Sequence, residues 1–187
     1  MDNVEVPLSI VSAPTKANLS AVVIGSTQYK SPAVENLSFW FSVYDRSTLA
    51  QVFSVVQDAH KSDVVPPDLA GKYNTPQYFL VLATTGLYSF YLPGGALYNF
   101  LVSNGASTQL KWLIQANKQV GCGAFGPMTY ALAGVLGPGQ PTHPRVELGS
   151  VDQTTSQYLE ATLIGVTTPT GTVYSPFPLT PPPVPPE

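Results

Sequence analysis

The chain has 187 residues, of which 44% are hydrophobic and only 10% are charged, with a formal net charge of −3. Hydrophobic residues spread along the whole chain exclude general disorder, and the length suits one domain with its own core. The weak negative charge, with no Lys/Arg cluster, excludes nucleic acid as a partner, and no apolar run reaches the ~18 residues of a membrane span.

The low fraction of charged residues also indicates what kind of side chains cover the surface. Ordinary soluble domains have roughly 25% charged residues, so neutral polar, glycine, proline and tyrosine residues must cover most of this chain. Such a surface meets another neutral surface at little desolvation cost. This composition is typical of secreted, appendage and virion proteins, so we expect an extracellular or particle-associated location. No basic and apolar signal segment opens the sequence, which suggests a mature or leaderless chain.

The first part of the chain predicts short strands. Apolar and β-branched runs bounded by Pro, Asn, Asp and Ser predict strands at 4–12, 19–28, 37–44 and 49–57. The last two form a hairpin whose turn lies at 45–48. The polar segment 58–75, interrupted by two adjacent prolines, has room for one short helical turn at most.

The strand at 37–44 contains a candidate ligand platform. Alternation places Leu37, Phe39, Phe41 and Val43 on one face, and Ser38, Trp40, Ser42 and Tyr44 on the other. Aromatic rings beside hydroxyl groups bind sugars and neutral protein surfaces, so Trp40 and Tyr44 are candidate ligand-binding residues. The pattern favours the alternative that a further apolar layer covers this face.

The second half of the chain predicts helices followed by strands. A continuous apolar run at 77–83 indicates a central strand that is buried on both faces. Helices are expected after Gly95, ending near Asn104, and from the candidate cap Ser107 to Gln119. Later strands are expected at 128–136, 146–149 and 158–167.

Residues 121–126 have the spacing G-x-G-x-x-G, which is found in dinucleotide-binding loops. Such a loop needs a strand before it and a helix after it, because the phosphates bind at the helix N-terminus. Here a predicted helix precedes the glycines and a predicted strand follows them. We therefore expect no nucleotide or other cofactor, and we interpret Cys122 as a small buried side chain.

The remaining ionisable residues suggest no reaction centre. Asp58, His60 and Asp63 are potential metal ligands, but their spacing matches no rigid pair, so a solvated loop is the better interpretation. The only other histidine is His143, and no G-x-S-x-G motif occurs. We expect no metal site, no catalytic residues and no enzymatic activity.

The order of features from Asn36 to Gly137 resembles the interleukin-like EMT inducer (PANDER-type) domain. The matching segments are the hairpin FWFSVYDRSTLAQVF, the buried strand YFLVLATTG, the helix QLKWLIQANKQVG and the strand TYALAGVLG. The resemblance implies a non-enzymatic protein that acts as a secreted signal or binds sugar. Two features depart from the family: Thr84 and Thr85 replace its usual acidic residues, and its disulfides are absent.

Together these patterns predict an α+β fold, with a mainly antiparallel sheet, one helical layer and extra strands at both ends. The expected organisation is N-terminal strands at 1–35, a core at 36–137 and C-terminal strands at 138–175, followed by a polyproline II tail at 176–187. The tail supplies the candidate assembly contacts Phe177, Leu179 and Val184. The favoured function is that of a non-enzymatic subunit that associates with copies of itself. A glycan-binding or secreted signalling module is the alternative.

Overall fold

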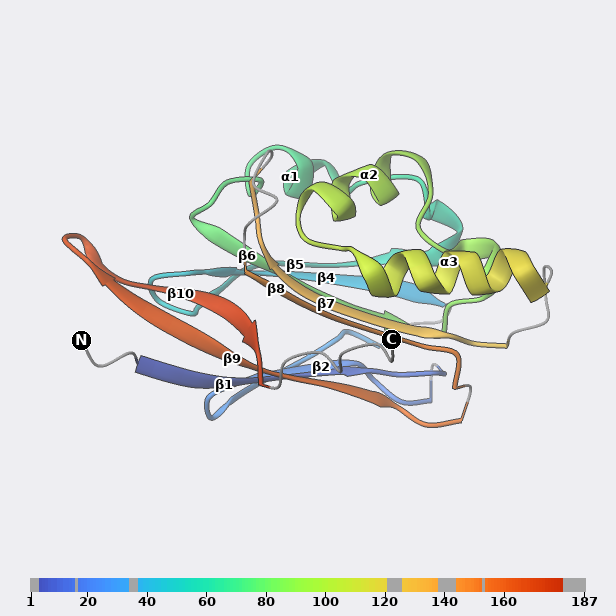
Figure 1. Ribbon diagram of the computed structural model, residues 1–187, viewed down its shortest axis with the longest axis horizontal. Coiled ribbons are helices and arrows are strands. Elements are labelled where there is room, and N and C mark those ends of the chain that lie inside the picture. Colours follow the sequence, from blue (N-terminus) through green and yellow to red (C-terminus); the bar gives the residue numbers. More distant parts are fainter. Residues whose placement is uncertain are drawn as a thin grey trace, which may run out of the picture.

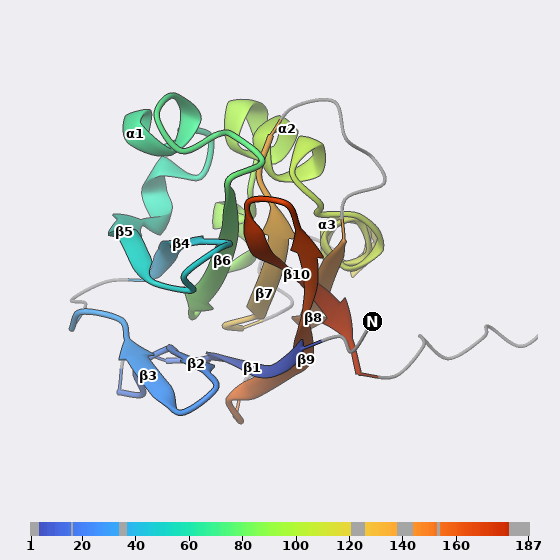
Figure 2. The same ribbon diagram turned by 90° about the vertical axis from the view of Figure 1, so that its left-hand side faces the viewer.

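The computed structural model describes residues 4–15, 17–33, 37–120, 126–137, 144–152 and 154–179. The described chain is mostly antiparallel β-sheet with few helices, as predicted. Two five-stranded sheets pack face to face, and the helices form a single layer over the far face of one of them (Figure 1). Figure 2 shows the same three layers from one end.

The central sheet, here called sheet B, has the order β5-β4-β6-β7-β8. Its strands are β4 (Ser38–Asp45), β5 (Gln51–Asp58), β6 (Tyr78–Thr85), β7 (Thr129–Val135) and β8 (Arg145–Ser150). The covering layer contains the 3-10 turns η1 (Ala59–Lys61) and η2 (Ser89–Tyr91) and the helices α1 (Pro67–Ala70), α2 (Gly95–Ser103) and α3 (Thr108–Val120). The predicted hairpin and helices are therefore confirmed.

The outer sheet, here called sheet A, has the order β10-β9-β1-β2-β3 and is built from both ends of the chain. Its strands are β1 (Val4–Ser12), β2 (Ala21–Ile24), β3 (Thr27–Lys30), β9 (Gln157–Thr168) and β10 (Gly171–Pro178). The prediction that the terminal strands extend one sheet is wrong, because only β8 joins sheet B. The others pair among themselves and bury an apolar face against it.

Two boundaries also differ from the prediction. The expected strand at 19–28 is a hairpin, because Gly25 takes a positive φ of 58° and reverses the chain between β2 and β3. The expected tail at 176–187 starts too early, because Pro176 and Pro178 belong to β10 and pair with Leu163 and Ala161. The tail beyond residue 179, including Val184, lies outside the described residues.

Sheet B has apolar side chains on both faces and therefore separates two cores. Toward the helices, Phe39, Phe41 and Val43 pack with side chains such as Leu97, Leu101, Leu110 and Leu113. Toward sheet A, Trp40, Tyr44, Phe79 and Val81 pack with Leu8, Ile10, Val22, Leu159 and Leu163. The continuous apolar run of β6 follows from this position, since a strand between two cores needs no polar face.

A carboxylate from sheet B fixes the start of α3. Glu147 on β8 accepts hydrogen bonds from the backbone N–H groups of Ser107 and Gln109, at 3.0 and 2.9 Å, and from the Ser107 hydroxyl at 2.6 Å. Its other oxygen accepts from the buried hydroxyl of Tyr130 at 2.8 Å. Burial, reinforced by the neighbouring Glu147, raises the pKa of Tyr130. The Ser107 hydroxyl was predicted to cap this helix, but it donates to Glu147, and the distant carboxylate accepts the N–H groups at the helix start.

Candidate functional site

The candidate platform formed by Trp40 and Tyr44 is not on the surface. Trp40 is 1% exposed and Tyr44 is 0% exposed, because sheet A covers this face of β4. The Trp40 indole N–H donates to the Ser54 hydroxyl at 2.8 Å, and the Tyr44 ring stacks on Phe79 at 5.2 Å. Burial raises the pKa of Tyr44. The prediction of a ligand platform at these residues is wrong, and the alternative of a covering apolar layer is confirmed.

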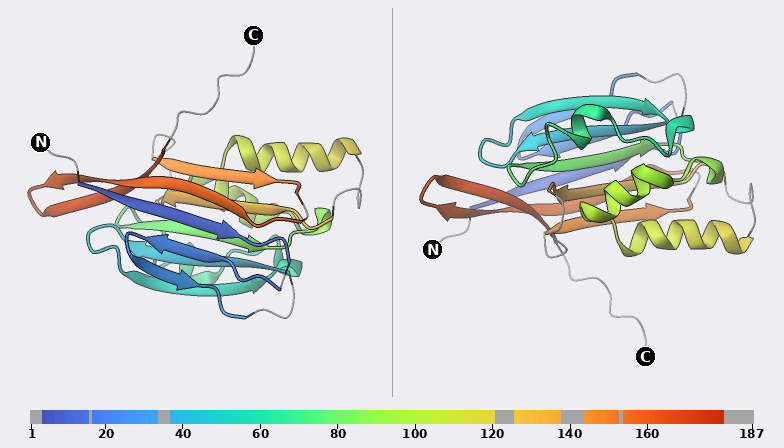
Figure 3. Two further views of the ribbon diagram at one scale, coloured as in Figure 1. Left: turned by 90° about the horizontal axis from the view of Figure 1, so that it is seen from below. Right: turned by 90° about the horizontal axis from the view of Figure 1, so that it is seen from above.

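The surface that remains open is the outer face of sheet A. Figure 3 (left) shows these strands from below, and no described helix crosses them. Tyr158 and Val166 on β9 are 62% and 55% exposed, and Phe177 on β10 is 36% exposed. Residues four apart on a strand point to the same face, so Tyr158, Thr162 and Val166 share one face of β9. Phe177 pairs with Thr162 on the neighbouring strand and therefore lies on that face too. Leu179, just beyond β10, is 58% exposed.

Two of these side chains were predicted from the sequence and two were missed. Phe177 and Leu179 were assembly candidates because they flank prolines in the presumed tail. Tyr158 and Val166 carried a signal that was not used: they lie on the polar side of an alternating strand, where large apolar residues are unexpected. The predicted contact Val184 lies outside the described residues.

The free edge of β10 is closed by an arginine and by prolines. Arg46, in the turn after β4, accepts the N–H of Tyr174 on its backbone carbonyl at 2.9 Å and donates from its guanidinium to the Tyr174 carbonyl at 2.7 Å. The same guanidinium donates to the Ser175 hydroxyl at 2.6 Å. Alternate N–H groups point to the same side of a strand, so Pro176 and Pro178 face this edge without a donor. A strand that approached this edge would therefore find few backbone groups free to form hydrogen bonds.

The other sheet edges are also protected. Strand β3 has only four residues and contains the exposed Lys30. On β5, the Tyr73 hydroxyl donates to the backbone carbonyl of Val52 at 3.1 Å. Strand β8 lies against α3 and β10. These devices disfavour association by edge-to-edge strand pairing, so the exposed faces are the surfaces through which this fold can meet a partner.

A concave site lies in the helical layer, between the start of α2 and the outer side of α3. It is a groove of about 540 Å³ lined by Pro93, Tyr98, Lys111, Ile114, Gln115 and Lys118. Gly94 and Gly95 complete the lining. Both lysines are exposed, whereas Tyr98 and Ile114 are half-buried and form its apolar part. The volume lies in the range of ordinary ligand sites.

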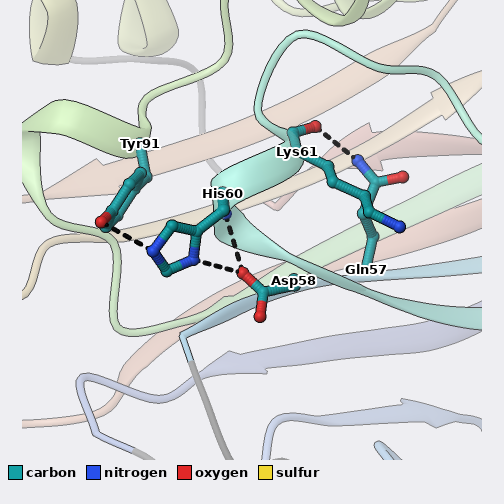
Figure 4. A network of polar contacts seen from close by, with 5 residues as sticks. All are labelled: Gln57, Asp58, His60, Lys61 and Tyr91. Atoms are coloured by element: carbon teal, nitrogen blue, oxygen red, sulfur yellow. Dashed lines mark hydrogen bonds and ion pairs between the residues drawn. The ribbon is translucent and has the colours of Figure 1, made fainter.

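A polar network fixes the loops that lead into this groove (Figure 4). His60 on η1 is held at Nδ1 by the Asp58 carboxylate, 2.6 Å away, and its Nε2 lies 2.9 Å from the Tyr91 hydroxyl on η2. With Nδ1–H donating to the carboxylate, Nε2 accepts the phenolic hydrogen. The two rings also lie in contact, with centroids 4.4 Å apart. The network joins η1 to η2 just before Pro93, so it positions the start of the groove.

The glycine motif at 121–126, with Cys122, lies almost wholly outside the described residues. The elements around it are described: α3 precedes it and β7 follows it, so the predicted order of helix before strand is confirmed. Within the described ranges no cluster of three or more His, Cys, Asp and Glu side chains is arranged to hold a metal ion. Among the described helices, none is long and apolar enough to cross a membrane.

No family model matches the chain, and no curated protein matches it. The resemblance to the interleukin-like EMT inducer domain therefore stays a prediction, and the surface must be interpreted from its own chemistry.

Proposed function

We propose that this protein is a non-enzymatic structural subunit that associates with copies of itself through the outer face of sheet A, within an extracellular or virion-like assembly. The exposure of Tyr158, Val166 and Phe177 on one uncovered sheet face supports the proposal most strongly. Large apolar side chains that project from an uncovered sheet face are candidate contacts with other proteins. The protected sheet edges direct that interaction to the face.

The charge distribution favours a second copy as the partner. Only 10% of the residues are charged, so two copies meet with little repulsion and little charge to desolvate. The carboxylate of Glu160, which lies among the exposed apolar residues of β9, already accepts a hydrogen bond from Ser9 at 2.6 Å. Tyrosine and phenylalanine are also enriched in protein interfaces relative to other surfaces.

Light scattering after size exclusion tests the proposal on the full chain, whose single-chain mass is 19.9 kDa. The unmodified protein should elute as an oligomer. Val166→Glu combined with Leu179→Glu should lower its mass toward that of a single chain, because each association would then bury two new like charges per copy.

Leu19→Glu combined with Val52→Glu is the matched control. These residues are also exposed, at 41% and 38%, but they lie at a loop and at a strand edge. The control changes the same residue types and adds the same charge, so it should leave the mass unchanged. An equal loss of mass in both variants would show that added charge, and not the face of sheet A, controls association.

A further inference from the structure

We propose that the groove between α2 and α3 binds the proline-rich segment 180–187 of a second copy. This inference rests on the proposed self-association and identifies one contact within it. The segment reads TPPPVPPE and is separated from the end of β10 by Leu179 alone. The groove is lined on one side by α3 residues and on the other by Pro93 and Tyr98.

The groove has the apolar surface that a proline-rich segment needs. Extended proline-rich segments bind in grooves lined by aromatic and aliphatic side chains, on which the pyrrolidine rings pack. Tyr98, Ile114 and Pro93 supply such surface. Trp112 is 44% exposed and lies on α3 three residues before the groove residue Gln115, outside the lining itself.

Hydrogen-bonding capacity matches as well. Prolines have carbonyl acceptors but no N–H, so the segment 180–187 offers many acceptors and few donors. The groove supplies donors: the hydroxyl of Tyr98, the amide of Gln115 and the ammonium groups of Lys111 and Lys118. A groove lined by acceptors would leave the proline carbonyls unsatisfied.

Charge is complementary. Glu187 is the only charged residue in the segment, whereas the groove contains two lysines. Lys111 and Lys118 are seven residues apart, so they lie on one side of α3 about 10 Å apart along its axis. A carboxylate at the end of an otherwise neutral segment therefore meets a positive site along the groove.

The position of β10 favours a second copy over the segment's own chain. In Figures 1 and 2, β10 ends on the side of sheet A, and α2 and α3 lie on the opposite side of sheet B. Packed layers are about 10 Å apart, so the groove is about 20 Å above sheet A. Eight residues in polyproline II conformation span about 25 Å, so the segment would spend most of its length reaching its own groove. A second copy that stacks its helical layer on sheet A instead places its groove directly beside the segment.

The resulting contact is heterologous, because the tail side of one copy meets the helical layer of the next. Complementation between two full-length variants tests it. The groove variant is Lys111→Glu with Lys118→Glu, and the tail variant is Pro182→Gly with Pro183→Gly and Glu187→Lys. Each variant alone should have a dissociation constant at least about tenfold higher than the unmodified chain, by light scattering against concentration.

Mixing the two variants should restore a complex of two chains, because the intact tail of the groove variant fits the intact groove of the tail variant. Lys61→Glu with Lys72→Glu makes the same charge change at exposed residues that neither line the groove nor belong to sheet A, and should behave as the unmodified chain. Lys111→Gln with Lys118→Gln removes only the charges and should also weaken association.

The emission of the exposed Trp112 gives a second readout: it should shift to the blue as the unmodified protein associates, and not in the tail variant.

Unchanged association of the groove variant, or no complex on mixing, would overturn the inference. If Val166→Glu with Leu179→Glu still lowered the mass, the proposed self-association would survive that result. A monomeric unmodified chain would overturn both.

Discussion

Glu147 should be one of the most important polar side chains for the stability of this fold. Its carboxylate accepts the backbone N–H groups of Ser107 and Gln109 at the start of α3, together with the hydroxyls of Ser107 and Tyr130. Glu147→Ala removes all of these acceptors at once. The helix then begins with unpaired N–H groups, and the buried Tyr130 hydroxyl has lost this partner.

The expected loss of unfolding free energy is about 3 kcal/mol. Losing a helix cap costs about 1–2 kcal/mol, and leaving a buried hydroxyl unsatisfied costs about 1–3 kcal/mol. Removing a negative charge from the positive end of α3 adds about 0.5 kcal/mol. Because these effects share one side chain, they are not independent, and the estimate lies below their upper limits.

Urea unfolding at fixed protein concentration measures the loss. Glu160→Ala is the control, because Glu160 also accepts a hydroxyl hydrogen bond but is exposed, so it should cost less than about 0.5 kcal/mol. Adding Tyr130→Phe to Glu147→Ala should recover about 1 kcal/mol by removing the orphaned hydroxyl. A loss below about 1 kcal/mol for Glu147→Ala, or no recovery with Tyr130→Phe, would refute this account of how α3 is held.

Three further changes test the packing and the turn after β4. Trp40→Ala should cost about 3–5 kcal/mol in urea unfolding, whereas Trp112→Ala, at an exposed site, should cost less than about 1 kcal/mol; similar costs would contradict the buried position of Trp40. Arg46→Lys should speed amide hydrogen exchange in β10 while β1 stays protected, since the guanidinium holds two residues of β10 that a single ammonium cannot reach together. Partial burial would raise the pKa of Asp45, but hydrogen bonds from neighbouring hydroxyl, amide and backbone groups hold it at about 2, below its ordinary 3.8. The ionised carboxylate therefore stabilises the fold above about pH 4, and this contribution is lost as the pH falls through about 2; Asp45→Asn should flatten the stability profile in that window, and an unchanged profile would contradict the assignment.

The local pattern of the sequence was sufficient to predict much of sheet B and its helical layer. The alternation from Leu37 to Tyr44 correctly separates two faces, and the apolar run at 77–83 correctly indicates a strand between two cores. The order of α3 and β7 around the glycine motif was also predictable from periodicity.

The second sheet was not predictable from local pattern, because its strands come from opposite ends of the chain. Trp40 and Tyr44 look the same in sequence whether solvent, helices or another sheet covers them. What covers them is determined by the pairing of β1 with β9, whose partner residues are more than 140 positions apart in the sequence. The Glu147 cap and the Arg46 clamp were missed for the same reason, since each joins residues far apart in the sequence.

The mass of the purified full-length chain in solution tests the central claim most directly. Light scattering at about 50 μM, a concentration that populates even a micromolar interface, should give a multiple of 19.9 kDa, and the mass should fall on dilution. A mass of one chain at that concentration, unchanged on dilution, would contradict the proposal that this protein works by binding copies of itself.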